Sequence, residues 1–553
     1  MEQGRLFLAI VLSFLVFVVW EFVFVDKPAN HLPSDAEKSI SSPEAQHTLN
    51  NSLSIDTPPA NAPGTANAPQ GKAFKTVSVS TPLYSATISE KNAAIVGFVL
   101  HHYKESIEPG SPNKELISGN NPLGTAILGF TDNAASGISN AIFTSDVKDE
   151  SIDVKNAVKS VSFFWQSDTG ILIEKKYSFY PDTYKIKMEV VIKNLSSHVF
   201  DNALTLSLIN AAPSGKQKFS FEGPFAYING KLDDVPVKDM LKKNKLTGTV
   251  DWAGLSEQYF MSAVIPEKPS ESTVLLKHYA ETNLLEVQYV QQMHKLQPST
   301  QKAFEVFLYI GPKRMSALKA AGGNLDQAIN FGFFDILAKP CLWLMNTIHD
   351  RWIPNYGVAI ILLTILFKII FWPLGTKSYK SMAEMKKLQP LMTQIREKYK
   401  NDKKKMNEEI MGLYKTYKVN PMSGCLPMLV QIPVFFAFYR MLYGSIELRH
   451  APFIGWITDL SAPDRLFRFN FAIPLMTPPY GIPVLTIIMG ATMFLQQKLS
   501  PPPGDPAQAR MMMLMPLIFT FIFINFPAGL VLYWLVNNIL SISQQYYITK
   551  KTV

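Results

Sequence analysis

The stretch Val358-Ala-Ile-Ile-Leu-Leu-Thr-Ile-Leu-Phe-Lys368-Ile-Ile-Phe-Trp-Pro373-Leu374 decides the fold, because one lysine interrupts an uncharged run long enough to cross a membrane. A lysine at the bilayer centre costs roughly 3 kcal/mol, so such residues usually face a wet cavity or a partner. The alternative is snorkelling, since Lys377 lies roughly 13 Å further along a helix axis and the stem of Lys368 can bend toward that surface. Lys368 is therefore a candidate functional residue, with both interpretations open.

Apolar runs at both ends of the 553-residue chain predict a polytopic membrane protein. The first run, residues 6–25, lacks the short apolar region and small-residue cleavage site of a signal peptide, so we expect an uncleaved anchor. Five more runs are each long enough for a ~30 Å hydrocarbon core. They cover residues 358–375, 425–444, 480–497, 511–526 and 529–548.

Lysine and arginine in short loops predict the orientation, because these residues resist translocation. Residues 376–420 carry twelve Lys/Arg and five Asp/Glu, whereas residues 445–479 carry three of each. We expect the first segment to be cytoplasmic and the second external, which places both termini in the cytoplasm and residues 26–350 outside. The basic segment accounts for most of the net charge of +9 and suits anionic lipids or ribosomal RNA, without predicting any nucleic-acid sequence preference.

The predicted fold is a membrane bundle of six transmembrane helices with a large all-β domain outside and a helical hairpin inside. Short alternating stretches such as residues 171–179 and 184–192, separated by turn residues, predict a β-sandwich. Residues 27–73 are rich in Pro, Ser, Ala and Asn and predict a flexible linker. The predicted order is anchor (1–26), linker (27–73), β-sandwich (74–325), interfacial amphipathic helix (326–355), second span (356–376), hairpin (377–420), four further spans (421–548) and tail (549–553).

The outer domain shows no zinc helix, no nucleophile elbow and no metal-spaced Cys or His, so we expect a binding or spacing role without a metal or cofactor. His101 and His102 are neighbours on a predicted strand and point to opposite faces, which disfavours a shared metal. Cys341 and Cys425 fall at different places in the topology, so a disulfide between them is not expected. Trp343 and Trp352 suit the headgroup depth of an interfacial helix.

The cytoplasmic segment predicts two helices separated near residues 400–402, with apolar residues spaced by three and four along each. Pro390 is expected to kink the first helix. The apolar seam is compatible with a purely structural role and the lysines with a solvated face. Their position directly after the Lys368 span favours a surface for arriving nascent chains, formed by Lys386, Lys387, Lys403, Lys404 and Lys405.

Polar residues recur in the other spans, and individually each is more often helix-to-helix glue than a functional group. Thr364 lies one helical turn before Lys368, on the same face. The last five spans contain no Asp or Glu, which suggests a wet cavity with a place for a negative charge supplied by a substrate. The further polar residues include Gln431, Thr486, Thr492, Asn537, Asn538, Ser541 and Ser543.

Several motifs resemble the YidC family of membrane protein insertases, in its Gram-negative form with a large periplasmic domain. They are Pro373-Leu-Gly-Thr-Lys-Ser-Tyr-Lys-Ser-Met382, Val419-Asn-Pro421-Met-Ser-Gly-Cys-Leu-Pro427-Met-Leu-Val-Gln431, Phe526-Pro-Ala-Gly-Leu-Val-Leu-Tyr533-Trp534 and Trp252-Ala-Gly-Leu-Ser-Glu-Gln-Tyr-Phe260.

The resemblance implies an inner-membrane protein whose five-helix core holds a hydrophilic groove, open to the cytoplasm and to lipid and closed toward the periplasm. Family members keep a positive groove residue that is usually arginine, and Lys368 stands there. The departure matters because a desolvated lysine can lose its proton. Many relatives have tyrosine where Trp534 stands, and we expect no long basic tail of the kind that some relatives carry. The implied groove residues are Lys368, Thr364, Gln431, Tyr533, Trp534 and Asn537.

The predicted function is therefore insertion and folding of nascent membrane proteins, with the ribosome, the signal-recognition machinery, the Sec translocon and anionic lipids as partners. No Walker motif is present, so neither nucleotide hydrolysis nor an enzymatic activity is expected. A solute transporter is the main alternative, although it would normally show paired half-repeats with broken helices. An intramembrane hydrolase is disfavoured because no serine or aspartate constellation accompanies Lys368.

Overall fold

The computed structural model describes residues 74–118, 121–132, 138–147, 149–213, 220–291, 295–417, 419, 426–500 and 506–552. The predicted anchor (1–26) and linker (27–73) lie outside these residues, as does Cys425. The chain divides into two units, residues 1–72 with 394–413, and residues 73–393 with 414–553. The described part of the first unit is thus residues 394–413.

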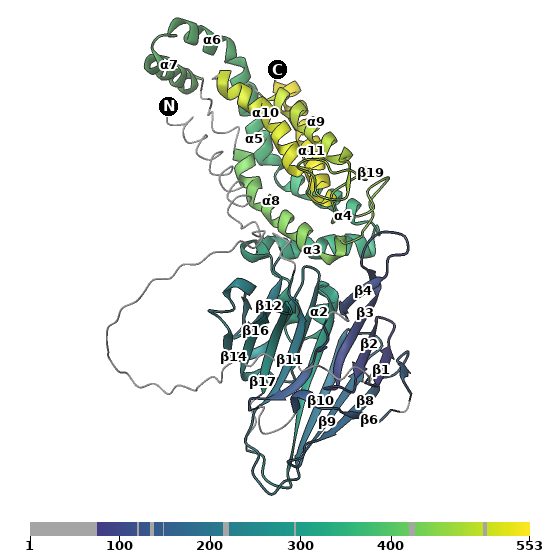
Figure 1. Ribbon diagram of the computed structural model, residues 1–553. Helices are drawn as coiled ribbons and strands as arrows, with labels where there is room; N and C mark the ends of the chain where they lie inside the picture. Colours follow the sequence, from purple (N-terminus) through teal and green to yellow (C-terminus); the bar gives the residue numbers. More distant parts are fainter. Residues whose placement is uncertain are drawn as a thin grey trace, which may run out of the picture. The chain divides into compact units, whose positions relative to one another are not determined.

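Two β-sheets form the first part of the second unit and confirm the predicted sandwich (Figure 1). The five-stranded sheet has the order β4-β3-β2-β1-β7, with β1 (Thr76–Ser80), β2 (Tyr84–Ser89), β3 (Ala94–Lys104), β4 (Asn113–Ile117) and β7 (Ser151–Asp153). The main path of the thirteen-stranded sheet is β5-β11-β17-β16-β14-β15-β18-β10-β9-β8-β6, and β12 and β13 extend it beside β14.

The strands of the larger sheet are β5 (Ile127–Phe130), β6 (Thr144–Ser145), β8 (Lys159–Gln166), β9 (Ile171–Phe179), β10 (Lys185–Asn194), β11 (Leu204–Ala211), β12 (Gly223–Ile228), β13 (Lys231–Asp234), β14 (Lys245–Ser256), β15 (Phe260–Pro266), β16 (Ser270–Tyr279), β17 (Leu284–Gln291) and β18 (Gln301–Pro312). Alternation of buried and partly exposed residues along β10, where Ile186, Met188, Val190 and Ile192 are buried, explains why these segments form strands with one face in the core.

Lys175 is a charged exception inside this core. It lies on β9, is fully buried, and its Nζ donates to the backbone oxygens of Ala126 (2.6 Å), Ala93 (2.8 Å) and Asn92 (3.4 Å). All three acceptor residues have positive φ values of 44–60°, which turns their carbonyls toward the lysine. Burial lowers the pKa of Lys175, whereas three carbonyl acceptors favour the ammonium form with its three donors. The side chain therefore ties the larger sheet to loops of the smaller one.

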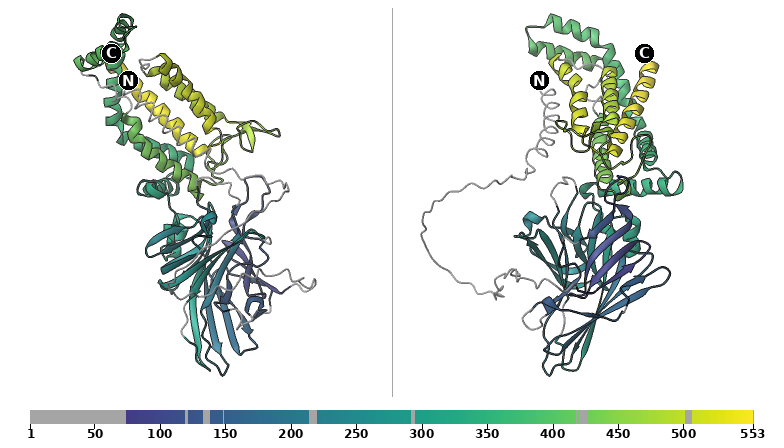
Figure 2. Two further views of the ribbon diagram at one scale, coloured as in Figure 1. Left: turned by 60° about the vertical axis from the view of Figure 1, so that its left-hand side comes forward. Right: turned by 45° about the vertical axis from the view of Figure 1, so that its right-hand side comes forward.

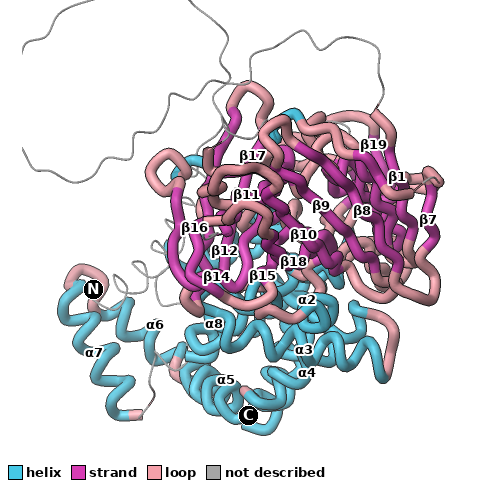
Figure 3. Tube along the Cα trace, turned by 90° about the horizontal axis from the view of Figure 1, so that it is seen from below, coloured by secondary structure: helices cyan, strands magenta, loops and turns pink. Residues whose placement is uncertain are grey.

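Helices follow the sandwich along the chain and are drawn in cyan in Figure 3, with the strands in magenta. They are α2 (Met315–Ala321), α3 (Asp335–Arg351), α4 (Tyr356–Ile370), α5 (Trp372–Lys387), α6 (Gln389–Lys398), α7 (Lys403–Thr416), α8 (Leu426–Gly444), α9 (Val484–Leu499), α10 (Pro506–Phe523) and α11 (Ala528–Thr552). Short 3-10 turns and strands complete the list: η2 (Ile138–Asn140), η3 (Val237–Asp239), η4 (Leu325–Ala328), η5 (Gly332–Phe334), η7 (Ile446–Leu448), β19 (Leu466–Phe469) and β20 (Tyr480–Ile482).

Helix α11 is central to the bundle, because it contacts α4, α5, α8 and α9 (Figure 2). Helix α3 contacts α4 and α8 and lies crosswise to α8 (Figure 1). Trp343 and Trp352 are 64% and 72% exposed at this helix, which leaves large apolar surface outside the protein core. The helix is shorter than the predicted 326–355, since residues 325–328 and 332–334 form 3-10 turns before it.

The structure divides the second predicted span, 356–376, between two helices. Helices α4 and α5 are bent by 65° at a break around Phe371. Pro373 stands at the start of α5, where it provides no N–H for the carbonyl four residues earlier and its ring crowds that turn, so the helix restarts there. Similarly, α5 ends at Lys387 and α6 begins at Gln389, just before Pro390.

Taken singly, no helix in the described ranges combines the length and apolar character of a membrane span. The bent pair α4–α5 meets that criterion together, and α9 and residues 510–523 of α10 form shorter apolar helices. The predicted span 480–497 also begins differently, because residues 480–482 form strand β20 and helix α9 starts at Val484.

Candidate functional site

The site is built around Lys368, which lies in the last turn of α4 and is partly exposed. Its Nζ donates to Ser541 Oγ on α11 at 2.7 Å. The Ser541 hydroxyl in turn donates to the backbone oxygen of Asn537 at 2.7 Å and also hydrogen-bonds the side chain of Tyr379 from α5. Within the described part of the chain, no Asp or Glu forms an ion pair with Lys368. The ammonium is therefore held by a neutral hydroxyl.

Thr364 lies one turn before Lys368 and is buried. Its hydroxyl donates to the Ile360 backbone oxygen at 2.7 Å, within its own helix. A threonine that satisfies its hydroxyl in this way presents its methyl group and remaining acceptor capacity to the surroundings. Thr364 thus shares the helix face of Lys368 without contacting its ammonium.

A second cluster lies about two turns before Ser541 on α11. The Gln431 side chain hydrogen-bonds the hydroxyl of Tyr533, and the Tyr533 ring stacks on Phe438 with centroids 4.7 Å apart. The ring of Trp534 meets Phe435 edge-on at 4.7 Å. Tyr533, Asn537 and Ser541 are spaced by four residues, so one face of α11 carries both the aromatic cluster and the partner of Lys368.

Four of the five lysines predicted to receive nascent chains have exposed side chains. Lys386, Lys387, Lys404 and Lys405 are exposed, and the side chain of Lys403 lies outside the described atoms. The Nζ of Lys405 lies 5.5 Å from the centroid of the Tyr399 ring.

Sequence reasoning missed Gln544, which ties α11 to the start of α5, directly after the break that follows α4. Its Nε2 donates to the Trp372 backbone oxygen at 3.0 Å and to Thr376 Oγ1 at 3.4 Å. Gly375 makes room for it, because a Cβ at that position would approach the Gln544 amide nitrogen to 2.9 Å. The signal was present in the spacing, since residues 537, 541 and 544 are polar and share one helix face.

Polar contacts also fix the loops that follow α8 and precede α11. Glu447 in η7 is buried and accepts from Asn346 Nδ2 at 3.2 Å. Burial raises the pKa of Glu447, an effect that hydrogen bonds and nearby Arg314 oppose. Arg465 donates to the backbone oxygens of Pro479 (2.9 Å) and Ile524 (2.8 Å). These bonds hold the loops before α9 and before α11 together.

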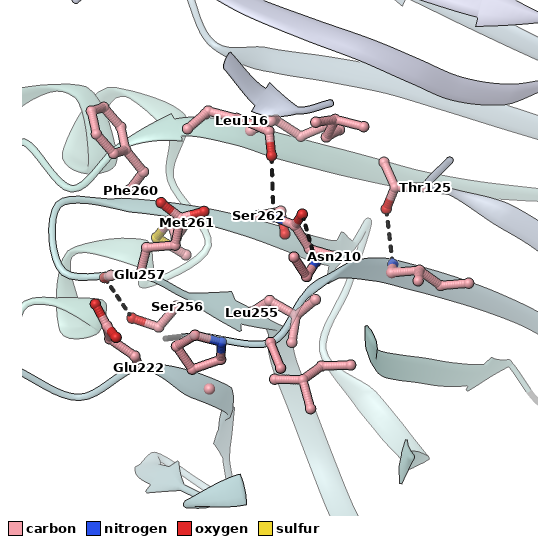
Figure 4. Close-up of a pocket in the computed structure, with 18 residues that line it drawn as sticks. Leu116, Thr125, Asn210, Glu222, Leu255, Ser256, Glu257, Phe260, Met261 and Ser262 are labelled. Carbon is pink, nitrogen blue, oxygen red and sulfur yellow. Dashed lines mark hydrogen bonds between the residues drawn. The ribbon is translucent and has the colours of Figure 1, made fainter. Parts of the chain in front are cut away.

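The β domain contains a cavity of about 240 Å³ (Figure 4). Glu222, Ser256 and Glu257 contribute polar groups, and Leu255 and Met261 contribute apolar surface. The predicted separation of the two histidines agrees with their surroundings. His101 bonds Ser85 Oγ at 2.8 Å, whereas His102 is exposed.

Comparison with known proteins relates both parts of the chain to described families. A family model described as "60Kd inner membrane protein" matches residues 348–553, and a model described as "YidC periplasmic domain" matches residues 76–344. Together with the sandwich and the helices, these matches define an inner-membrane protein with a large periplasmic β domain.

Full-length relatives are more specific. The chain is 39% identical to "Membrane protein insertase YidC" of Syntrophobacter fumaroxidans, over 99% of this chain and all of that protein. It is 43% identical to the protein of the same name from Syntrophus aciditrophicus, over 86% of this chain and 85% of that protein. A crystal structure of an active YidC insertase matches with 19% identity and a TM-score of 0.38, covering 86% of this chain and 93% of the other. The chain belongs to the YidC family of membrane protein insertases.

Proposed function

We propose that this protein inserts nascent membrane proteins into the bacterial inner membrane and that Lys368 recruits acidic or polar segments of its substrates. The observation that carries the proposal is the environment of the Lys368 ammonium. Its Nζ donates to the neutral hydroxyl of Ser541, and within the described ranges no carboxylate pairs with it. A cation placed in this way attracts an anion from outside the protein.

The strength of this attraction suits recruitment. Two unit charges 4 Å apart gain about 4 kcal/mol at an effective dielectric constant of ~20, before the cost of desolvation. That energy is enough to draw an acidic tail toward α4 and too small to trap it. An apolar substrate segment then gains ~25 cal/mol for each Å² that it moves from water into lipid. The membrane potential assists transfer of an acidic tail across the bilayer.

The topology completes the proposal. Six spans, with the anchor as the first, place both termini in the cytoplasm and the β domain in the periplasm. Helices α8 to α11 with α4 enclose a hydrophilic groove that Lys368, Thr364, Gln431, Tyr533, Trp534 and Asn537 line. The hairpin of α6 and α7, with the lysines near it, receives chains from the ribosome and the signal-recognition machinery, contacts anionic lipids and works with or without the Sec translocon.

A reconstituted assay tests the proposed function. Proteoliposomes containing only this protein are expected to insert a small single-span protein with an acidic tail, measured by protease protection of the transferred tail. Empty liposomes are the control. Insertion equal to that of the control, together with protein-dependent solute flux, would instead support the transporter alternative.

Replacing Gln544 by methionine is expected to reduce insertion several-fold in this assay. The change removes the amide that ties α11 to the first turn of α5, just after the break that follows Lys368, so the position of Lys368 becomes less defined. Ser543→Ala is the matched control, since that exposed hydroxyl bonds only its own helix at Ile539. Equal insertion by the two variants would exclude a positioning role for Gln544.

A further inference from the structure

Residues 466–482 form an exposed apolar hairpin between α8 and α9. Strands β19 and β20 pair at its base. Its sequence, LFRFNFAIPLMTPPYGI, contains one charged residue, Arg468, and no acid. Phe467, Phe471 and Leu475 are 69%, 64% and 77% exposed. Large apolar side chains gathered in this way on a surface mark an interaction site.

The backbone conformation of the apolar hairpin holds the side chains of Phe467 and Leu475 in exposed positions. In the described ranges, the non-glycine residues with positive φ are mostly small or polar, and the large apolar ones are Phe467 (50°) and Leu475 (66°). A bulky residue is strained in this region of backbone space, and such strain persists only where the surroundings compensate for it. Here the strained conformation keeps both side chains exposed.

The base of the hairpin is firmly held, so its exposed tip is a fixed feature. Arg465 bonds Pro479 and Ile524, as described above. Asn525 accepts from the Thr477 backbone N–H at 2.8 Å and donates to the Leu475 backbone oxygen at 2.8 Å. These bonds anchor both strained regions to the turn between α10 and α11.

We propose that the tip of the apolar hairpin inserts into the outer leaflet of the lipid bilayer. The absence of acidic residues suits a lipid surface. The chain also continues from Ile482, which is 37% exposed, into α9, whose exposed Ile487 and Ile488 extend the same apolar surface. Insertion supplies the apolar contact that Phe467 and Leu475 lack. This inference rests on the proposed external position of residues 445–479.

The apolar hairpin of residues 466–482 also contacts the β domain. Arg468 forms an ion pair with Glu108, in the loop between β3 and β4. Arg449, just after η7, donates to the backbone oxygens of Lys104 (2.6 Å) and Glu105 (3.1 Å) in the same region. A hairpin seated in lipid therefore holds this edge of the β domain at the membrane surface.

Depth-dependent fluorescence quenching tests the inference. Phe471→Cys is labelled with an environment-sensitive fluorophore in the full chain, with Cys341 and Cys425 replaced by alanine, in vesicles of phosphatidylethanolamine and phosphatidylglycerol. Lys231→Cys, at the exposed first residue of β13, is the matched control. Lipids carrying a nitroxide near the headgroup are expected to quench the label at 471 several-fold more than at 231, and aqueous iodide to show the opposite order.

Equal iodide quenching at the two positions would overturn the inference. Shielding of position 471 from both quenchers would also overturn it, because the occupant would then be protein. Phe471 makes none of the bonds of the hairpin base, so the variant is expected to unfold at the temperature of the parent. Insertion activity is measured on the same vesicles. Normal insertion with a water-exposed tip contradicts only the lipid contact, whereas lost insertion with a lipid-quenched tip contradicts only the proposed function.

Discussion

Lys368→Glu is expected to reduce insertion of an acidic-tailed substrate by at least about tenfold, which corresponds to a loss of about 1.4 kcal/mol. The change turns an attraction of about 4 kcal/mol, before desolvation, into a repulsion of similar size. It also replaces the ammonium that donates to Ser541 by a carboxylate, which can accept from that hydroxyl only if the hydroxyl turns away from the Asn537 backbone oxygen. Protease protection of the tail in proteoliposomes measures the result.

Two controls separate charge from hydrogen bonding and packing. Lys368→Arg keeps the positive charge and is expected to retain insertion, as the residue usual in the family would. Ser541→Ala removes the neutral partner and leaves the charge, and its effect is expected to be much smaller than that of Lys368→Glu. If the glutamate and arginine variants insert the acidic-tailed substrate equally well, the charge has no part in recruitment.

Lys175→Met is expected to destabilise the β domain by about 3 kcal/mol, because at a comparable volume it removes the ammonium donor from the buried carbonyls of Asn92, Ala93 and Ala126, of which Ala93 keeps the Tyr177 hydroxyl. For a domain of this size the midpoint of thermal unfolding is then expected to fall by at least about 6 °C. The loss of β-sheet circular dichroism of the full chain in detergent measures it. Faster hydrogen exchange around Ala93 and Ala126 would locate the effect.

The neighbouring residue supplies the control. Lys176 lies on the same strand and forms only a partly exposed ion pair with Glu189 at 3.7 Å. Lys176→Met is therefore expected to change stability by no more than about 0.5 kcal/mol. Similar unfolding of the two variants would mean that Lys175 does not join the two sheets as its hydrogen bonds indicate.

The β-sandwich could be predicted from the sequence because its strands alternate cleanly, as β9 and β10 do. The break at Phe371 was missed although Pro373 was visible, since hydropathy counts apolar residues and is insensitive to a missing N–H. Residues 445–479 show little hydrophobic periodicity. Their backbone conformation depends on partners that are distant in the sequence, such as Ile524 and Asn525. Local sequence does not contain that information.

Only some residues of the site could be predicted from the sequence, for a similar reason. Lys368 was identified because a charge in an apolar run has a large energetic cost. Its partner Ser541 was noted only as one of several polar residues, and Gln544 was not noted, because an uncharged side chain in a helix is rarely unusual by itself. Their importance depends on which helices are neighbours. The contacts of α11 with α4 and α5 join segments that lie far apart in the sequence.

The position of β18 in the larger sheet has a consequence for biosynthesis. This strand lies between β15 and β10, so the sheet cannot be completed until Pro312 has been synthesised. About 240 residues, including every helix from α3 to α11, remain to be translated at that moment. At about 5–20 residues per second, their synthesis takes roughly 12–50 s, ample time for a domain with such distant pairings to fold first. In a newly synthesised copy, the β domain can therefore be folded before helices α3 to α11 have been translated.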